Sequence, residues 1–254
     1  MKAQESVDGK DRPLWWSLEH NSGLWAIALV TETYAKNAVF EGVNSSMDQV
    51  TRSHQWQSSR LALQLLMEPC GVEQSKELLP LNVKKDPSGK PYIVNPVGQA
   101  VPISLAHTVG MGAAALPRHS SIQGIGADVE QFSERFLRVV SRVACTEEME
   151  KVRGTILDGL ETEAAVLIWV IKEACYKATL IQNALFGKNQ LIRIIDKKYD
   201  SLESEEQRWA GCLVSGKTEP YELIEFEAGS FCQDEALWYW AVAWTRGKVD
   251  RTNG

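Results

Sequence analysis

The sequence predicts an α+β protein built from two similar halves. Strand-like segments and long helical patterns alternate along its 254 residues, in the order strand, helix, strands, and then again strand, helices, strands. This order is typical of sheets that carry helices on one face. The second run begins near residue 120, which predicts an N-terminal half at residues 14–120 and a C-terminal half at residues 121–246.

The N-terminal half opens with an apolar segment of strand length at residues 24–31. Residues 45–67 have helical spacing with an apolar stripe near the end, and Pro69 and Gly71 stop this helix. Asp86 to Gly89 form a turn between two of the short strands that follow. These strands are expected at residues 81–84, 91–94, 101–106 and 111–116.

The C-terminal half is expected to begin with a strand at residues 122–130 and a helix at residues 134–144. Thr146 is expected to cap the next helix, because two glutamates follow it in the first turn. The longest helical pattern of the chain covers residues 163–182. Three strands are expected to complete the half, around residues 207–214, 221–227 and 236–245.

The composition is that of a soluble globular protein, with 44% hydrophobic and 24% charged residues. A formal net charge of -6 makes nucleic acid an unexpected partner. The polar opening segment lacks the apolar stretch of a signal peptide, and no apolar run reaches the ~18 residues of a membrane-spanning helix. The five cysteines lack metal or redox spacing, so buried, reduced thiols and a cytoplasmic location without membrane attachment are expected.

Two carboxylates share one face of the strand at residues 124–130. Side chains alternate between faces, so Asp128 and Glu130 lie with Gly124 and Gly126, and the apolar residues between them face the core. Glycine in a strand often marks close approach by a ligand or by another backbone. The two carboxylates repel each other, and a bound cation would remove that cost. The alternative is a solvent-facing acidic edge.

The long helix supplies a third carboxylate. Glu173 lies opposite the apolar stripe, with Trp169 and Lys177 one turn away on either side. One interpretation is a solvated Glu173–Lys177 pair, but a tryptophan on this face favours packing against something. Carboxylates are the ligands that Mg²⁺ takes together with substrate phosphates. Asp128, Glu130 and Glu173 therefore form a candidate magnesium site, and Lys177 is placed to reach a phosphate.

Two motifs carry a family resemblance. The segments G-I-G-A-D-V-E at residues 124–130 and W-V-I-K-E-A-C-Y-K-A at residues 169–178 together resemble the 4′-phosphopantetheinyl transferases. Upstream, Gly89-Lys90-Pro91-Tyr92 resembles the Gly-Lys-Pro turn of that family. Residues 103–108 resemble its strand ending in a Ser-His-Ser or Ser-His-Thr element, with Ala106 where many members have serine, which leaves cofactor contacts from Ser104 and Thr108 open. By its position, Arg60 is similar to the family's cofactor-binding arginine.

The resemblance implies the pseudo-dimeric fold of the larger, monomeric family members, with the active site between the halves. It implies a magnesium-dependent enzyme that transfers the 4′-phosphopantetheine group of coenzyme A to a serine of an acyl or peptidyl carrier protein and releases adenosine 3′,5′-bisphosphate. Glu173 and Lys177 are then the catalytic residues, and Asp128, Glu130 and Glu173 hold Mg²⁺. The residues expected to bind coenzyme A are Arg60, Lys90, His107 and Lys177.

Two other functions remain open. The first is an inactive member of the same fold that only binds coenzyme A or a partner. The second is another magnesium-dependent phosphate enzyme, such as a nucleotide hydrolase, although the sequence contains no Gly-x-x-x-x-Gly-Lys-Ser/Thr phosphate loop.

A row of arginines follows the acidic strand. Arg135, Arg138 and Arg142 share one face of the expected helix, and Lys151 and Arg153 come after them. They are candidates for docking an acidic carrier protein, and the alternative is a solvated basic face.

Overall fold

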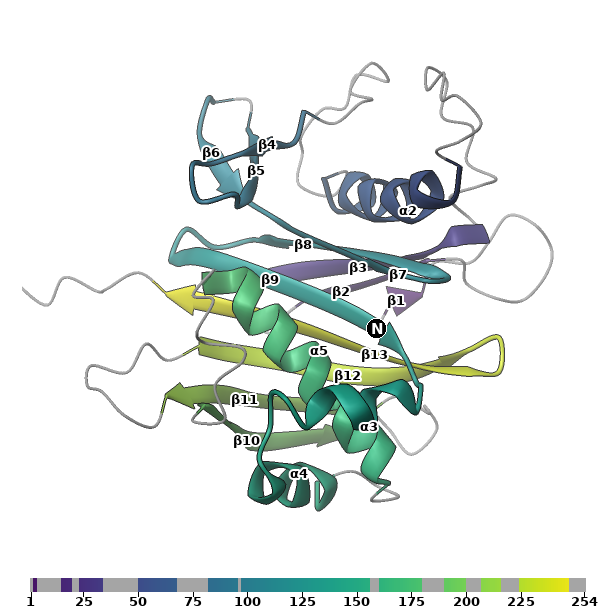
Figure 1. The fold of residues 1–254 in the computed structure, drawn as a ribbon. Helices are drawn as coiled ribbons and strands as arrows, with labels where there is room; N and C mark the ends of the chain where they lie inside the picture. The colour runs from purple at the N-terminus through teal and green to yellow at the C-terminus, as the bar shows by residue number, and fades with distance from the viewer. Residues whose placement is uncertain are drawn as a thin grey trace, which may run out of the picture.

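The computed structural model describes residues 2–3, 15–19, 23–33, 50–67, 82–95, 97–155, 160–179, 190–199, 207–215 and 224–246. The architecture is α+β, as predicted. Two five-stranded antiparallel sheets face each other, and each carries a long helix on its outer face, so the layers follow the order helix, sheet, sheet, helix (Figure 1). None of the helices that the structure describes is both long and apolar enough to cross a membrane.

The first sheet has the strand order β1-β2-β3-β8-β7. Its members are β1 (Lys2–Ala3), β2 (Trp15–Glu19), β3 (Trp25–Thr31), β7 (Ser104–Thr108) and β8 (Met111–Pro117). Helix α2 (Val50–Met67) packs on its outer face. A small three-stranded sheet, β4 (Lys84–Lys85), β5 (Pro91–Val94) and β6 (Ala100–Pro102), lies beside this helix (Figure 1).

The second sheet has the strand order β10-β11-β12-β13-β9. Its members are β9 (Ile122–Gln131), β10 (Gln190–Tyr199), β11 (Gln207–Ser215), β12 (Ile224–Gln233) and β13 (Ala236–Arg246). Helix α5 (Glu161–Thr179) covers its outer face together with two short helices, α3 (Arg135–Val140) and α4 (Thr146–Arg153).

Part of each sheet has the same connectivity. In each sheet, the strand that precedes the long helix pairs with the last strand of that sheet in the chain, and this last strand pairs with the one before it, which gives β3-β8-β7 and β9-β13-β12. The long helix is α2 after β3 and α5 after β9. The predicted boundary at residues 120 and 121 falls in the connection between β8 and β9 and stays a prediction.

The core between the sheets is built by alternation along the strands. Ile125, Ala127 and Val129 of β9 are buried there, as predicted. They pack among tryptophans of the two sheets, and Trp25 of β3 meets Trp240 and Trp244 of β13 at centroid distances of 6.3 and 5.9 Å. The opposite face of β9 therefore belongs to α5.

Several predicted boundaries were wrong. The strand expected at residues 101–106 is two strands, because Ile103 leaves the ladder to donate a backbone hydrogen bond to Pro91. The helix expected at 134–144 ends at Val140. Cys145, not Thr146, holds the N-cap position, with extended backbone and no side-chain hydrogen bond. The helix expected at 45–67 begins at Val50, residues 45–49 lie outside the described residues, and strand β10 was not predicted.

Candidate functional site between β9 and α5

Helix α5 packs directly on β9 because two glycines allow it. A Cβ atom on Gly126 would overlap with the carbonyl oxygen of Ala174, and one on Gly124 would overlap with that of Ala178. Helix backbone therefore fills the space beside these glycines, and close backbone approach is the interpretation that the structure supports. The contact places the carboxylates of β9 against the side of α5 that carries Glu173 and Lys177.

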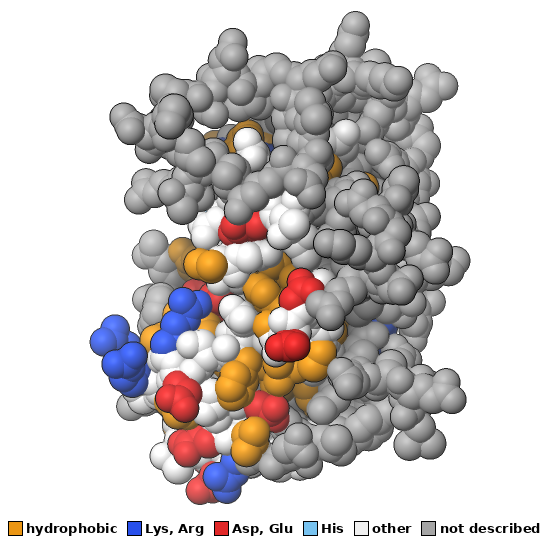
Figure 2. All heavy atoms as spheres, turned by 90° about the vertical axis from the view of Figure 1, so that its right-hand side faces the viewer, with side chains coloured by type: hydrophobic (Ala, Val, Ile, Leu, Met, Phe, Trp, Pro, Cys, Tyr) orange, Lys and Arg blue, Asp and Glu red, His pale blue; other side chains and the backbone are white. Residues whose placement is uncertain are grey.

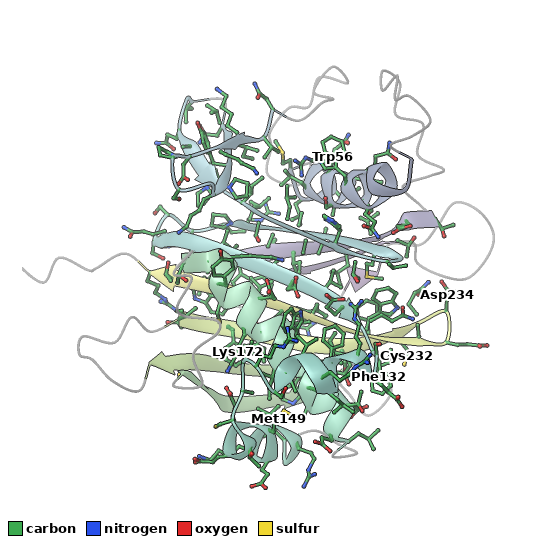
Figure 3. The ribbon with its side chains drawn as sticks, in the orientation of Figure 1. Trp56, Phe132, Met149, Lys172, Cys232 and Asp234 are labelled. Carbon is green, nitrogen blue, oxygen red and sulfur yellow. The ribbon has the colours of Figure 1, made fainter. Side chains whose placement is uncertain are left out.

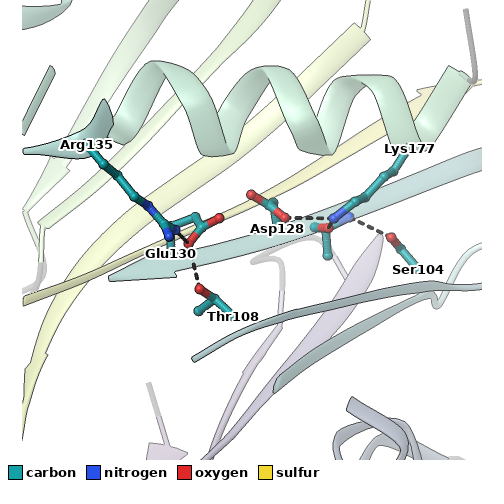
Figure 4. A network of polar contacts seen from close by, with 7 residues as sticks. Ser104, Thr108, Asp128, Glu130, Arg135 and Lys177 are labelled. Carbon is teal, nitrogen blue, oxygen red and sulfur yellow. Dashed lines mark hydrogen bonds and ion pairs between the residues drawn. The ribbon is translucent and has the colours of Figure 1, made fainter. Parts of the chain in front are cut away.

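Lys177 and Asp128 form the first ion pair of the site. The Lys177 ammonium lies 2.7 Å from Asp128 Oδ1 and also donates to the backbone oxygen of Ala127 at 3.1 Å (Figure 4). Asp128 is 7% exposed, and burial raises the pKa of its carboxyl group while Lys177 lowers it. A buried carboxylate thus depends on Lys177 for compensation.

Glu130 has two partners on different elements. Its Oε2 atom accepts a hydrogen bond of 2.7 Å from the Thr108 hydroxyl on β7 and one of 2.8 Å from the guanidinium of Arg135 (Figure 4). Burial, and then the neighbouring charge of Asp128, raise the pKa of Glu130 to about 7. The two carboxylates repel each other, as the sequence predicted.

Glu173 belongs to the same electrostatic neighbourhood. Burial raises the pKa of its carboxyl group, the negative charge of Asp128 raises it further, and Lys177 opposes the shift. The face of α5 that carries it is packed and not simply solvated, because the rings of Trp169 and Phe136 lie 6.0 Å apart. The tryptophan on this face thus packs against α3, as its position indicated.

The donor set suits a divalent cation, although the carboxylates are not gathered around one point. Among the described residues, no three His, Cys, Asp or Glu side chains are close enough together to hold a metal ion. Asp128 Oδ2, however, is buried without a hydrogen-bond partner among them, and the pKa values of Asp128, Glu130 and Glu173 are all raised by burial. Buried carboxylates with an unpaired oxygen fit a hard cation such as Mg²⁺. The assignment of Asp128, Glu130 and Glu173 as ligands stays a prediction.

Basic side chains of the N-terminal half lie on one side of this site. His107 lies on β7 and is exposed. The loss of solvent around part of the ring lowers its pKa, and the charges of Lys177 and Arg60 lower the pKa further, while the charge of Asp128 raises it. Arg60 is partly buried on α2 without an acidic partner among the described residues, and burial lowers its pKa. Its guanidinium lies 4.6 Å from the ring centroid of Trp56.

Lys90 lies at the C-terminal end of α5. Its ammonium group donates a hydrogen bond of 3.1 Å to the backbone oxygen of Ala178, near the C-terminus of α5. The turn that carries it is held by the Asp86 carboxylate, which accepts from the backbone of Ser88 and Lys90. Lysine at a helix C-terminus is favoured by the helix dipole, and the ammonium groups of Lys90 and Lys177 both lie near this end of α5.

The hydroxyl groups of β7 tie it to β9. Ser104 Oγ accepts a hydrogen bond of 2.8 Å from the backbone amide of Ala127, and Thr108 donates to Glu130. Ala106, between them, is 3% exposed and faces the core between the sheets. These contacts give Ser104 and Thr108 a role in joining the two sheets, which the sequence did not indicate.

Lys172, the other lysine of the motif at residues 169–178, is buried, and this burial was not predicted from the sequence. Lys172 points into the interior from α5 (Figure 3), where its ammonium donates to the Val143 carbonyl and lies 2.7 Å from Glu148 of α4. Its position four residues after Ile168 and three before Cys175, both on the predicted apolar stripe, was a signal of burial.

Comparison with known proteins gives one match. A search of curated proteins found none that matches the chain. Residues 124–223, from the glycines of β9 through α5 and beyond, match the model of a protein family. Both motifs that suggested a family lie inside this range. The matching model is that of the 4′-phosphopantetheinyl transferase superfamily, so over residues 124–223 the chain is similar to that superfamily, as the two motifs predicted.

Proposed function

We propose that this protein transfers the 4′-phosphopantetheine group of coenzyme A to a serine hydroxyl of an acyl or peptidyl carrier protein and releases adenosine 3′,5′-bisphosphate. The observation that carries the proposal is the meeting of Asp128, Glu130 and Lys177 between β9 and α5, next to Glu173 and within the family match. Asp128, Glu130 and Glu173 would hold Mg²⁺. The ion would neutralise the diphosphate and lower the cost of charge on the leaving phosphate.

The residues of α5 have two tasks in this reaction. The serine oxygen forms a bond to the phosphorus that carries the pantetheine arm, and the bond from that phosphorus to the bridging oxygen breaks. Glu173 takes the serine proton, a role for which its raised pKa suits it. Lys177 stabilises or protonates the leaving oxygen of adenosine 3′,5′-bisphosphate.

The N-terminal half would bind the nucleotide end of coenzyme A. Arg60 has no acidic partner among the described residues, and Asp128 and Glu32 act on His107 through charge alone. Lys90 adds an ammonium group at the end of α5. Arginine binds phosphate as a fork and lysine as a point charge, so this group suits several phosphates of one ligand.

The basic side chains after β9 would meet an acidic carrier. Arg138 and Arg142 are exposed and have no acidic partner among the described residues, although Arg142 lies beyond the end of α3. Figure 2 shows basic side chains gathered along one edge of the face that it draws, with acidic and apolar side chains beside them. Reversing the charge of Arg138 and Arg142 should raise the KM for the carrier and leave the affinity for coenzyme A unchanged. Unaltered carrier kinetics would remove this docking surface.

The deciding experiment is intact-mass analysis of a panel of apo carrier proteins after incubation with the protein, Mg²⁺ and coenzyme A. The expected result is a mass gain of one phosphopantetheine group on a carrier, lost with Glu173→Gln and with the acceptor serine changed to alanine. Coenzyme A binding without modification of any carrier would favour an inactive binding protein. Cleavage of the diphosphate without a modified protein would favour a hydrolase.

A further inference from the structure

The ion pair between Arg135 and Glu130 joins the candidate cation site to the candidate docking surface for the carrier. Glu130 is a predicted ligand of the cation, and Arg135 is the first residue of α3, in the row of arginines that would meet the carrier. The side chain of Arg135 is 51% exposed, whereas that of Glu130 is 15% exposed. One guanidinium therefore contacts the metal site on its inner side and solvent on its outer side.

We propose that Arg135 couples carrier docking to cation binding: it holds Glu130 in an ion pair in the free protein, and an acidic carrier surface draws it away, which frees Glu130 for the divalent cation. This inference rests on the proposed function. Arg135 is a positioning residue here, because it acts on the site through Glu130.

Electrostatic repulsion prevents Glu130 from pairing with Arg135 and binding a cation at the same time. Glu130 Oε2 already accepts hydrogen bonds from Arg135 and Thr108, and a guanidinium at 2.8 Å repels any cation that approaches the same carboxylate. Thr108 is neutral and competes with a cation only for the oxygen. Removal of Arg135 is thus the change that turns Glu130 into a better ligand.

The geometry allows Arg135 to turn outward. Its guanidinium is half exposed and lies 4.7 Å from the ring centroid of Phe136, and an exposed ion pair contributes little stability. Arg138 follows one turn later, exposed and without an acidic partner among the described residues. A carboxylate-rich surface that contacts Arg138 meets the outer side of Arg135 as well.

Lys177 is less exposed than Arg135 and lies on a different helix. Its side chain is 28% exposed, and it reaches Asp128 from α5 and not from the arginine row. The carrier therefore has no direct access to the Lys177–Asp128 pair. By linkage, a carrier that frees Glu130 strengthens cation binding by the same factor by which the cation strengthens carrier binding.

The test measures Mn²⁺ binding by electron paramagnetic resonance, in place of Mg²⁺ and without coenzyme A. The full-length protein is titrated alone and with an apo carrier whose acceptor serine is alanine. For the unchanged protein, the carrier should lower the Kd for Mn²⁺. For Arg135→Gln, the Kd of the free protein should fall about three- to tenfold, the size expected for a half-exposed ion pair, and the carrier should no longer change it.

A matched variant controls for the loss of any exposed arginine pair. Arg246 lies 2.9 Å from Glu225, with side-chain exposures of 49% and 28%, so Arg246→Gln removes a similar ion pair away from α3 and should leave the Kd for Mn²⁺ unchanged. Arg135→Lys keeps the charge and should retain the weak Mn²⁺ binding of the unchanged protein. If Arg135→Gln fails to fold, the effect of the carrier on the Kd of the unchanged protein for Mn²⁺ still tests the coupling.

Two outcomes would overturn the coupling. One is an Arg135→Gln protein whose affinity for Mn²⁺ and response to the carrier equal those of the unchanged protein, or an Arg135→Lys protein that binds Mn²⁺ as tightly as Arg135→Gln. The other is a carrier that binds the unchanged protein without altering its Kd for Mn²⁺. Failure of the proposed function gives a different result, because intact-mass analysis would then show no modified carrier while the Arg135 variants still changed Mn²⁺ binding in the free protein.

Discussion

Lys172 and Glu148 form an ion pair in the interior, at 2.7 Å, with side-chain exposures of 1% and 0%. The pair joins α5 to α4, and the second hydrogen bond of Lys172, to the Val143 carbonyl, fastens the segment between α3 and α4. The lysine next to Glu173 in the motif thus joins α5 to α4 and to the segment before it.

Replacing Lys172 with methionine should destabilise the protein by about 3–5 kcal/mol, because the Glu148 carboxylate is left buried without its charge partner. Lys151→Met is the matched control, since it removes an exposed i,i+4 pair with Glu147, and it should leave stability nearly unchanged. Urea unfolding followed by circular dichroism measures both free energies. Equal, small losses for the two variants would show that the buried pair does not stabilise the fold.

Gly126→Ala should cost about 1–3 kcal/mol or more, since the new methyl group would displace α5 from β9. It should also reduce transfer activity through the altered position of Glu173. Gly154→Ala serves as control, because its Cβ would lie 3.5 Å from its nearest neighbours and its φ of -66° is ordinary. Thermal unfolding of both variants checks the difference, and a stable Gly126→Ala protein would contradict the backbone contact.

Lys90→Ala should raise the Kd for coenzyme A about tenfold, the effect expected for loss of a charged hydrogen-bond donor. The exposed Lys84 lies on the neighbouring strand β4 and offers a lysine of the same charge away from α5. Isothermal titration calorimetry of Lys90→Ala and Lys84→Ala separates a specific contact from a general effect of positive charge. A similar loss in both variants would favour the general effect.

Trp56→Ala should weaken coenzyme A binding about two- to fivefold through Arg60, whose guanidinium would lose the aromatic face that orients it. Figure 3 shows Trp56 on the outer part of α2, and its side chain is 45% exposed, so the fold does not depend on it. Trp56→Phe keeps an aromatic face and should restore most of the affinity in the same titration. If phenylalanine and alanine behave alike, Trp56 does not position Arg60.

Alkylation of the cysteines should distinguish Cys232 from Cys175. Burial raises the pKa of the Cys175 thiol well above its usual range, so the thiol stays protonated and unreactive at neutral and mildly alkaline pH. Cys232 is exposed near the β12–β13 turn and should react first. Mass mapping after brief iodoacetamide treatment measures the order, and modification of Cys175 before unfolding would contradict its burial.

The central elements of the site were predictable from sequence because two periodicities determine them. Alternation in β9 separates the core residues from Asp128 and Glu130, and helical spacing separates the apolar stripe of α5 from Glu173. Both patterns depend on burial of one face, which is a strong local signal. Cys232 shows the converse, since the cysteines were predicted to be buried and the structure exposes this one near the end of β12.

What the sequence did not predict depends on tertiary contacts. Arg135, Arg138 and Arg142 look alike in the sequence, and only the turn between β9 and α3 directs the first of them back to Glu130. The glycines of β9 suggested either a ligand or a backbone, and the choice required the position of α5. The predicted ends of helices were wrong where a single residue decides them, as at the N-cap of α4.

The strands that end the two sheets, β7 and β9, lie against each other at one corner of the sandwich, fastened by Ser104 and Thr108. Each therefore shields the other from pairing with a foreign strand, the usual hazard at the margin of a sheet. The opposite margins are β1 and β10. Self-association by strand addition would start at those two strands and not at the corner where β7 and β9 meet.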